Sequence, residues 1–333
     1  MDNDTHHSTM NFQSIILESL ETMRLGETAK GQRFKALAYK KAIDGIKRVK
    51  TPILKAEDVK DTEGVGKKIY EKIQEIVATG QLRAAERMKE TTEVGAMEIL
   101  LKVHGIGPVK AKELAEAGIK TIVQLRKALE KDPSLLNDTQ KLGLQYYEAG
   151  IQRIPREEMD QHKHRLVAYM PPGLTGTIVG SYRRGNADSG DVDMLVTYSG
   201  SEKVAQKAFK DFVTEMTKAG YIVDKLVSGA KKWMGYIQLP GGVPRRLDLL
   251  LTPPQEYAYA LLYFTGSDRF NVAFRRHCLD LGYTLNEHTM KPKTGVDQPL
   301  PPAMESEKDI FDFVRLRYVL PTERVDSAQI VKA

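Results

Sequence analysis

The stretch GSYRRGNADSGDVDMLV, residues 180–196, places glycines, two arginines and a spaced pair of aspartates directly before an apolar run. If DVDMLV forms a strand, Asp191 and Asp193 point to the same face, because side chains alternate along a strand. Two carboxylates at that spacing repel each other unless a cation lies between them, and such oxygen ligands suit Mg²⁺. For an Asp-x-Asp pair alone, an exposed acidic strand end is the simpler alternative.

A third acid strengthens the metal hypothesis. Asp248 lies within the apolar segment RRLDLLL, residues 245–251, where an unpaired charge would be costly. With the first pair it would complete a site for two Mg²⁺ ions, or Mn²⁺, roughly 4 Å apart. Such ions lower the pKa of an attacking hydroxyl and stabilise a leaving pyrophosphate. Ser181 and Arg184 could then hold triphosphate oxygens, while Gly180 and Gly190 allow close backbone approach.

The composition is that of an ordinary soluble globular protein, with 333 residues, 41% hydrophobic and 28% charged, which is enough for two or three domains. The single cysteine, Cys278, excludes an internal disulfide. The N-terminus has no apolar signal segment and no window could span a membrane, so we expect an intracellular protein, nuclear if the source is eukaryotic. The net charge of +6 hints at a polyanionic partner. The basic run at residues 33–50 is equally compatible with a solvated helix face.

The apolar pattern predicts an all-α front followed by an α+β body. Helical spacing occurs at residues 12–25, 34–49, 67–78, 93–103, 109–116 and 122–129. Beyond residue 154, short β-branched runs predict strands at 176–180, 191–198, 221–227, 234–239 and 245–251. One long helix, 204–219, interrupts them, and further helices are expected at 255–264 and 270–281. The tail after Arg324 is predicted to be frayed.

Two segments of the front repeat one pattern. EGVGKKI, residues 63–69, and HGIGPVKAKEL, residues 104–114, each place an apolar residue between two glycines before a basic helix start. The amides at such a turn can donate to a phosphate. A single copy is also typical of many tight helix turns, but two copies favour sequence-independent DNA binding. The residues concerned are Gly64, Gly66, Gly105 and Gly107.

Several longer motifs together resemble the family X DNA polymerases, with the greatest likeness to the DNA polymerase beta branch. They are IPREEM (154–159), GSYRRG with SGDVD, RRLDLLL, YFTGSDRFN (263–271) and SEKDIFDF (306–313). The resemblance runs from about residue 12 to 325. It implies a disordered N-terminus (1–11) and a helical deoxyribose-phosphate lyase domain with the first helix-hairpin-helix (12–88). A helical DNA-binding subdomain with the second hairpin (89–153), a nucleotidyltransferase-type palm with a mixed β-sheet (154–254) and an α+β nucleotide-selection subdomain (255–333) would follow.

The resemblance also implies roles for individual residues. Asp191, Asp193 and Asp248 would bind the two divalent ions, with Asp248 as the base for the primer 3′-hydroxyl. The residues expected to contact the incoming deoxynucleoside triphosphate (dNTP) are Arg153, Ser181, Arg184, Gly190, Tyr263, Phe264, Gly266, Asp268 and Asn271. Arg246 and Arg275 would lie near the primer terminus and the template. Without the resemblance, the aromatic residues would be interpreted as core.

The front domain would carry a lyase centred on Lys72, the position of the family's Schiff-base lysine. Lys68 and Lys72 lie one helical turn apart and share a face, and nearby positive charge activates a lysine by lowering its pKa. Lys35, Tyr39 and Lys68 would hold the 5′-phosphate. Phe34 and Ala84 depart from the family pattern, which puts lyase efficiency in question. The hairpins would each hold K⁺ or Na⁺ through main-chain carbonyls, those of Lys60, Thr62 and Val65 and those of Leu101, Val103 and Ile106.

The sequence therefore predicts a template-dependent, gap-filling DNA polymerase with lyase activity in base-excision repair. The connection PGGVP between residues 234–239 and 245–251 is short, whereas template-independent relatives carry a longer loop there. We expect neither an N-terminal interaction domain nor a C-terminal phosphoesterase domain. The expected partners are gapped or nicked DNA with a 5′-phosphate, dNTPs and repair proteins, for a monomer with no membrane contact. The alternatives are a polymerase without efficient lyase activity, a nucleotidyltransferase acting on RNA ends or small molecules, and a DNA-end-binding module.

Overall fold

The computed structural model describes residues 11–49, 51–90 and 92–333. The chain forms two compact units, of which the first ends at Leu144 and the second comprises Gln145–Ala333. The expected disorder of residues 1–11 falls, apart from the last residue, outside the described part. The finer division into four ordered domains stays a prediction. No described helix combines the length and apolar character needed to cross a membrane.

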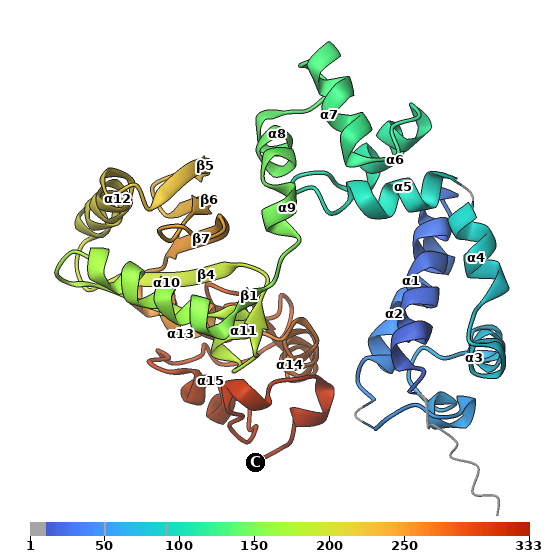
Figure 1. The fold of residues 1–333 in the computed structure, drawn as a ribbon. Helices are drawn as coiled ribbons and strands as arrows, with labels where there is room; N and C mark the ends of the chain where they lie inside the picture. The colour runs from blue at the N-terminus through green and yellow to red at the C-terminus, as the bar shows by residue number, and fades with distance from the viewer. Residues whose placement is uncertain (1–10, 50, 91) are drawn as a thin grey trace, which may run out of the picture. The chain divides into compact units, whose positions relative to one another are not determined.

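Helices make up the secondary structure described for the first unit (Figure 1). Helix α3 illustrates why they form: Ile69, Ile73 and Ile76 recur at helical spacing and are buried, and Gly80 ends the helix with φ +76°. Helices α4 and α8 were not predicted. The bounds are α1 Gln13–Ala29, α2 Arg33–Ile46, the short 3-10 helix η1 Ala56–Val59, α3 Lys67–Thr79, α4 Arg83–Glu90, α5 Thr92–Leu100, α6 Pro108–Glu116, α7 Ile122–Lys131 and α8 Asp138–Gln145.

The two glycine turns of this unit share one backbone geometry. In the first, the amide of Val65 donates to Thr62 O at 3.0 Å; in the second, Ile106 donates to Val103 O at 3.0 Å. The glycines inside these turns, Gly64 and Gly105, have φ of +87° and +85°, a conformation that strongly favours glycine. The internal repeat seen in the sequence is therefore a repeat of structure, and each turn leads into a helix, α3 or α6.

The second unit is built on a five-stranded sheet in the order β2-β4-β7-β6-β5. Only β4 and β7 are parallel; the other pairs are antiparallel. The elements of this part of the chain are α9 Tyr147–Gly150, β1 Ile154–Pro155, α10 Arg156–Tyr169, β2 Leu174–Ile178, α11 Gly180–Arg183, β3 Asp188–Ser189, β4 Val192–Tyr198, α12 Glu202–Lys218, β5 Ile222–Ser228, β6 Lys232–Ile237 and β7 Arg245–Leu251. The predicted α+β body is thus confirmed.

The two faces of this sheet differ in character. Alternate residues of β7 are buried, starting at Arg245 and ending at Leu251, and Leu247 and Leu249 pack in the large core with α12 residues such as Phe209 and Phe212. Arg246, Asp248 and Leu250 alternate with them and point to the opposite face. The alternation along β7 therefore directs Arg246 and Asp248 away from the core that the strand forms with α12.

A third group of elements follows the sheet: α13 Pro254–Thr265, α14 Asp268–Asp280, β8 Tyr283–Leu285, β9 Met290–Pro292, α15 Glu307–Phe313, η2 Pro321–Glu323 and η3 Ser327–Gln329. Helix α13 packs against the face of the sheet that carries Asp248. Its residue Ala260 forms a small separate core there with Val179 and Leu195. The remaining helices surround a core of their own that contains Phe270, Phe274 and Phe311.

Two predictions about this unit are wrong. First, the region beyond residue 154 that was expected to hold one long helix among its strands holds two, because α10 was not predicted. Only Met159, His162 and Leu166 of α10 are buried, and three buried positions are too few to give a clear apolar pattern. The tail after Arg324 is not frayed. Asp326 is 5% exposed and caps η3, and the amide of Arg317 donates to Val331 O at 2.9 Å.

Candidate active site

The three predicted acidic residues converge where β4 and β7 run side by side. Asp193 and Asp248 are direct partners in the parallel register, and Asp191 immediately precedes β4. Burial, together with the charges of Asp191 and Asp248, raises the pKa of Asp193 to about 7. Burial also raises the pKa of Asp248, against the lowering effect of Arg246. Such a cluster of carboxylates needs positive charge to remain ionised at neutral pH.

Arg246 supplies part of that charge in the structure. Its guanidinium pairs with Asp191, and one of its nitrogens lies 3.6 Å from Asp248 Oδ2. In the part of the chain that is described, no three acidic, histidine or cysteine side chains are arranged as a ready metal site. Instead, the guanidinium of Arg246 lies among the carboxylates. Asp248 Oδ1 is nevertheless buried without a hydrogen-bond partner. Three carboxylates with a free buried oxygen fit a hard divalent cation.

A cavity of about 560 Å³ opens beside the aspartates. Every residue predicted to contact the nucleotide lines it, together with Asp191, Asp193 and Arg275: the predicted contacts are Arg153, Ser181, Arg184, Gly190, Tyr263, Phe264, Gly266, Asp268 and Asn271. The structure thus brings these residues to one place from the segment before β1, from α11 and the residue after it, from the β3–β4 turn, and from α13, α14 and their connection. Asn186 and Val272 also line the cavity and were not predicted; neither carries a sequence signal that would have singled it out.

The cavity's glycines make room for charged side chains. At Gly180, with φ +60°, a Cβ atom would lie 3.0 Å from Asp193 Oδ2. At Gly190 it would lie 3.1 Å from Arg153 Nη1, and at Gly266, with φ +70°, 3.1 Å from Arg184 Nη1. These distances are tighter than ordinary contacts, so the three glycines allow the acidic and basic groups to approach the cavity.

The polar side chains of the cavity are held by defined partners. Ser181 Oγ donates to Ser189 Oγ at 2.9 Å, and Arg153 Nη2 pairs with Asp188 Oδ1 at 2.7 Å. Asn271 donates to Tyr263 O at 2.6 Å, which ties α14 to the end of α13. The rings of Tyr263 and Phe264 meet edge to face, with centroids 5.0 Å apart. Aromatic surface and phosphate-binding groups therefore share one cavity.

A second cavity, of about 430 Å³, reaches the carboxylates from another side. Asp193 and Phe264 line both cavities, whereas Asp248 lines only the second. Lys232 and His288 are also in its wall. The carboxylates thus stand between two spaces, which suits a reaction that joins two substrates.

Four domain models match successive parts of the chain. They are described as a helix-hairpin-helix domain (residues 13–82), the fingers domain of DNA polymerase lambda (98–149), the DNA polymerase beta palm (153–254) and the DNA polymerase beta thumb (260–325). DNA polymerase lambda of Rattus norvegicus is 31% identical over 94% of this chain. The chain belongs to the family X DNA polymerases. Within this family, the chain is similar to both DNA polymerase beta and DNA polymerase lambda.

Other family X relatives show similar coverage. DNA polymerase lambda of Arabidopsis thaliana is 31% identical over 89% of the chain, and the DNA polymerase type-X family protein pol4 of Schizosaccharomyces pombe is 27% identical over 92%. The chain spans 56%, 59% and 63% of the lengths of the rat, plant and yeast proteins.

The lysines predicted for the family X lyase lie on the first unit. Lys72 is half-buried on α3, and its Nζ lies 3.4 Å from the main-chain oxygen of Lys68, one turn earlier. Lys35 is exposed, and its Nζ lies 3.7 Å from Glu27 of α1. Burial and the charge of Glu27 raise the pKa of Tyr39. Lys35 and Tyr39 therefore both lie near Glu27, an acid that was not predicted as a site residue.

Proposed function

We propose that this protein is a template-dependent DNA polymerase that fills short gaps by nucleotidyl transfer. One observation carries the proposal: Asp193 and Asp248 lie side by side on adjacent strands, between a cavity lined by phosphate-binding and aromatic groups and a second cavity. The nucleotide would occupy the first cavity, and Asp248 would meet the primer 3′-hydroxyl from the other side. The family membership supports the same activity.

The residues of the site would divide the reaction between them. Ser181, Arg184 and Arg153 would bind the triphosphate, since hydrogen bonds to phosphate oxygens are strongest from charged donors. Asp248 has an unpartnered buried oxygen and a raised pKa, so it can accept the hydroxyl proton. The 3′-oxygen would form a bond to the α-phosphorus as the bond to the pyrophosphate oxygen breaks.

Divalent cations would be held by Asp191, Asp193 and Asp248. They would supply charge that lowers the pKa of the 3′-hydroxyl and stabilises the departing pyrophosphate. Binding of such ions requires Arg246 to release Asp191, with which it pairs in the structure. Arg246 is thus the internal cation that an incoming metal ion would replace.

Nucleotide selection would fall to the end of α13 and the start of α14. Tyr263 and Phe264 would pack under the sugar and leave little space for a 2′-hydroxyl. Asp268 and Asn271 would lie against the base, and Arg275, which is exposed on α14, would reach toward the template. The shared cavity lining of these residues supports this assignment.

The test is single-nucleotide extension of a primer on a gapped duplex with each of the four templating bases in turn. The proposal expects incorporation of the complementary nucleotide in each case, with Mg²⁺ or Mn²⁺ present, and none with chelator. Incorporation that ignores the template would favour the nucleotidyltransferase alternative. DNA binding without any incorporation would favour an end-binding module.

We further propose lyase activity at Lys72. Its amine would attack the C1′ aldehyde of a 5′-deoxyribose phosphate and lose water to form a Schiff base; β-elimination would then break the C3′–O bond and leave a 5′-phosphate on the DNA. The position of the Lys72 amine, 3.4 Å from the main-chain oxygen of Lys68 on α3, supports this. The paired glycine turns would grip the flanking backbone, with K⁺ or Na⁺ on their carbonyls. Together the two activities would serve base-excision repair.

A further inference from the structure

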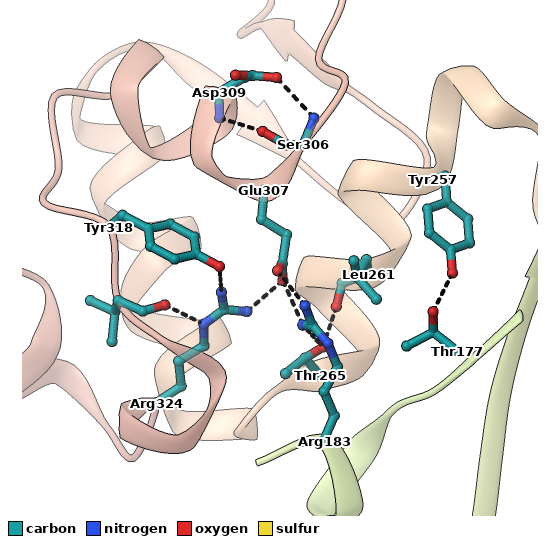
Figure 2. A network of polar contacts seen from close by, with 11 residues as sticks. Thr177, Arg183, Tyr257, Leu261, Thr265, Ser306, Glu307, Asp309, Tyr318 and Arg324 are labelled. Atoms are coloured by element: carbon teal, nitrogen blue, oxygen red, sulfur yellow. Dashed lines mark hydrogen bonds and ion pairs between the residues drawn. The ribbon is translucent and has the colours of Figure 1, made fainter. Parts of the chain in front are cut away.

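Thr265, the last residue of α13, joins two neighbouring arginines of the palm. Its side chain is fully buried. Its Oγ1 accepts a hydrogen bond from Arg183 Nη1 at 2.6 Å and donates to Leu261 O at 2.5 Å, as Figure 2 shows. Its main-chain oxygen accepts a hydrogen bond from Arg184 Nη1 at 2.6 Å. One residue therefore fixes two adjacent guanidinium groups through two different atoms.

The first arginine is held rigidly by a buried ion cluster. Arg183 Nη2 pairs with Glu307 Oε2 at 2.7 Å, and Arg324 Nη1 pairs with Glu307 Oε1 at 2.5 Å (Figure 2). Glu307 is 4% exposed and Arg324 is 1% exposed. Buried charges tolerate displacement poorly, because each loses its partner in a medium of low dielectric. The cluster thus gives the hydroxyl of Thr265 a fixed point of attachment.

The second arginine faces the nucleotide cavity. Arg184 lines that cavity, and it is half-buried, with one N–H committed to Thr265 O. A guanidinium has five N–H donors, so the others remain for phosphate oxygens. An arginine held in place before the ligand arrives loses less side-chain freedom on binding, which increases affinity.

We propose that Thr265 is a positioning residue for the incoming nucleotide: its hydroxyl, anchored on Arg183 of the Arg183–Glu307–Arg324 cluster, fixes the end of α13, and its carbonyl holds Arg184 toward the triphosphate. This inference rests on the proposed polymerase function. It assigns a role in nucleotide binding to a residue that touches neither the nucleotide nor the aspartates, and it connects the cavity to α15 and the chain's C-terminal segment.

The chain's C-terminal segment also contacts the residues that directly follow α13. Ser267 Oγ donates to Val325 O at 2.5 Å, next to Arg324 in the ion cluster. Ser267 also caps α14, because its Oγ accepts from the amide of Phe270. The residues on both sides of Gly266 are therefore anchored, and Gly266 itself lies against Arg184.

The experiment compares Thr265→Val, which keeps the side-chain shape but removes the hydroxyl, with Thr265→Ser, which keeps the hydroxyl. Both are made in the full chain and assayed for single-nucleotide gap filling. In Thr265→Val the dNTP KM should rise about tenfold, the effect of one lost hydrogen bond to a charged group, with kcat within about twofold. Thr265→Ser should restore the KM to within about twofold of the parent.

Tyr257→Phe is the matched control. It removes a hydrogen bond of the same helix, from Tyr257 Oη to Thr177 Oγ1 at 2.9 Å, which anchors α13 to β2 rather than to the arginines (Figure 2). It should lower the melting temperature, as Thr265→Val does, but leave the KM unchanged. A KM unchanged in Thr265→Val, or raised equally in Tyr257→Phe, would overturn the inference. A parent protein that incorporates no nucleotide would instead overturn the proposed function.

Discussion

Replacing Glu307 by glutamine should strongly destabilise the second unit. The change keeps the size of the side chain but leaves Arg183 and Arg324 without their shared anion, and the side chain of Arg324 is 0% exposed. Removing one partner of a buried ion pair costs about 3–5 kcal/mol. Arg324 keeps a hydrogen bond to Val319 O at 3.0 Å, which places the expected loss near the lower end, about 3 kcal/mol.

The protein's one tryptophan makes this measurable. Trp233 is the only tryptophan and is 2% exposed in the core under α12, so its fluorescence reports unfolding of the second unit. For a unit of this size, a loss of about 3 kcal/mol lowers Tm by roughly 6–12 °C. Asp312→Asn, which breaks an exposed pair with Lys308 on the same helix, should change stability by no more than about 0.5 kcal/mol.

The pH dependence gives a second signature of Glu307. Burial alone would raise its pKa, but hydrogen bonds from Arg183 and Arg324 outweigh burial, and the pKa is lowered. A carboxyl whose pKa is lower in the folded state adds stability that is complete above the unfolded value, about 4.3, and is lost as pH falls through the folded value. The parent should therefore lose more stability in acid than Glu307→Gln. A loss below about 1 kcal/mol at pH 7, or parallel pH curves, would refute the reasoning.

Three further changes test other parts of the molecule. Gly266→Ala should weaken dNTP binding, because it puts a Cβ 3.1 Å from Arg184 Nη1 at φ +70°; titration of dNTP in the gap-filling assay would show it, and an unchanged KM would contradict it. Lys72→Ala should abolish borohydride trapping on an incised abasic duplex while gap filling persists; an adduct that survives the change would move the nucleophile elsewhere. Burial lowers the pKa of His162 from 6.5 to about 4. The neutral side chain therefore contributes its full share of folding stability above pH 6.5, and that share is lost as pH falls toward 4, because the unfolded state binds the proton first. His162→Asn should flatten the stability curve in that window, measured by urea unfolding at each pH, and an equal slope would speak against it.

Absence of an adduct with the parent protein would carry separate information. It would leave a gap-filling polymerase whose first unit only binds DNA. Phe34, which is 90% exposed at the start of α2, and Ala84 would then be the first residues to change, because they depart from the family pattern. The polymerase proposal would stand unaffected.

The acidic centre could be predicted from sequence because its signals are local. The alternation of Asp191 and Asp193 in an apolar run, and a charge at Asp248 within another, each indicate a strand with one polar face. The parallel register that places Asp193 beside Asp248 is a long-range contact that these local signals do not contain. The glycine turns were equally readable, because Gly64 and Gly105 mark positive φ.

The long-range contacts that hold the site residues in place could not be predicted in this way. Arg183 reaches Glu307 across 124 positions and Thr265 across 82, and no local pattern encodes such contacts. The pairing of Arg246 with Asp191 likewise depends on how β7 lies beside the turn before β4. The tail after Arg324 was expected to be frayed, because the order at this end of the chain involves the pairing of Arg324 with Glu307, which an isolated sequence window does not reveal.

The proposed polymerase activity requires that Asp193 and Asp248 form the reaction centre. Single-turnover incorporation on a gapped duplex, with Asp193→Asn and Asp248→Asn, tests it directly. Asp211→Asn, which changes an acid whose side chain is 47% exposed and pairs with Lys207 on α12, is the control. We predict that both centre variants lose incorporation by at least about a hundredfold, an effect of the size seen when transition-state charge stabilisation is removed, while they bind the duplex as the parent does. Incorporation at the parental rate in either variant, or duplex binding lost together with activity, would contradict the account.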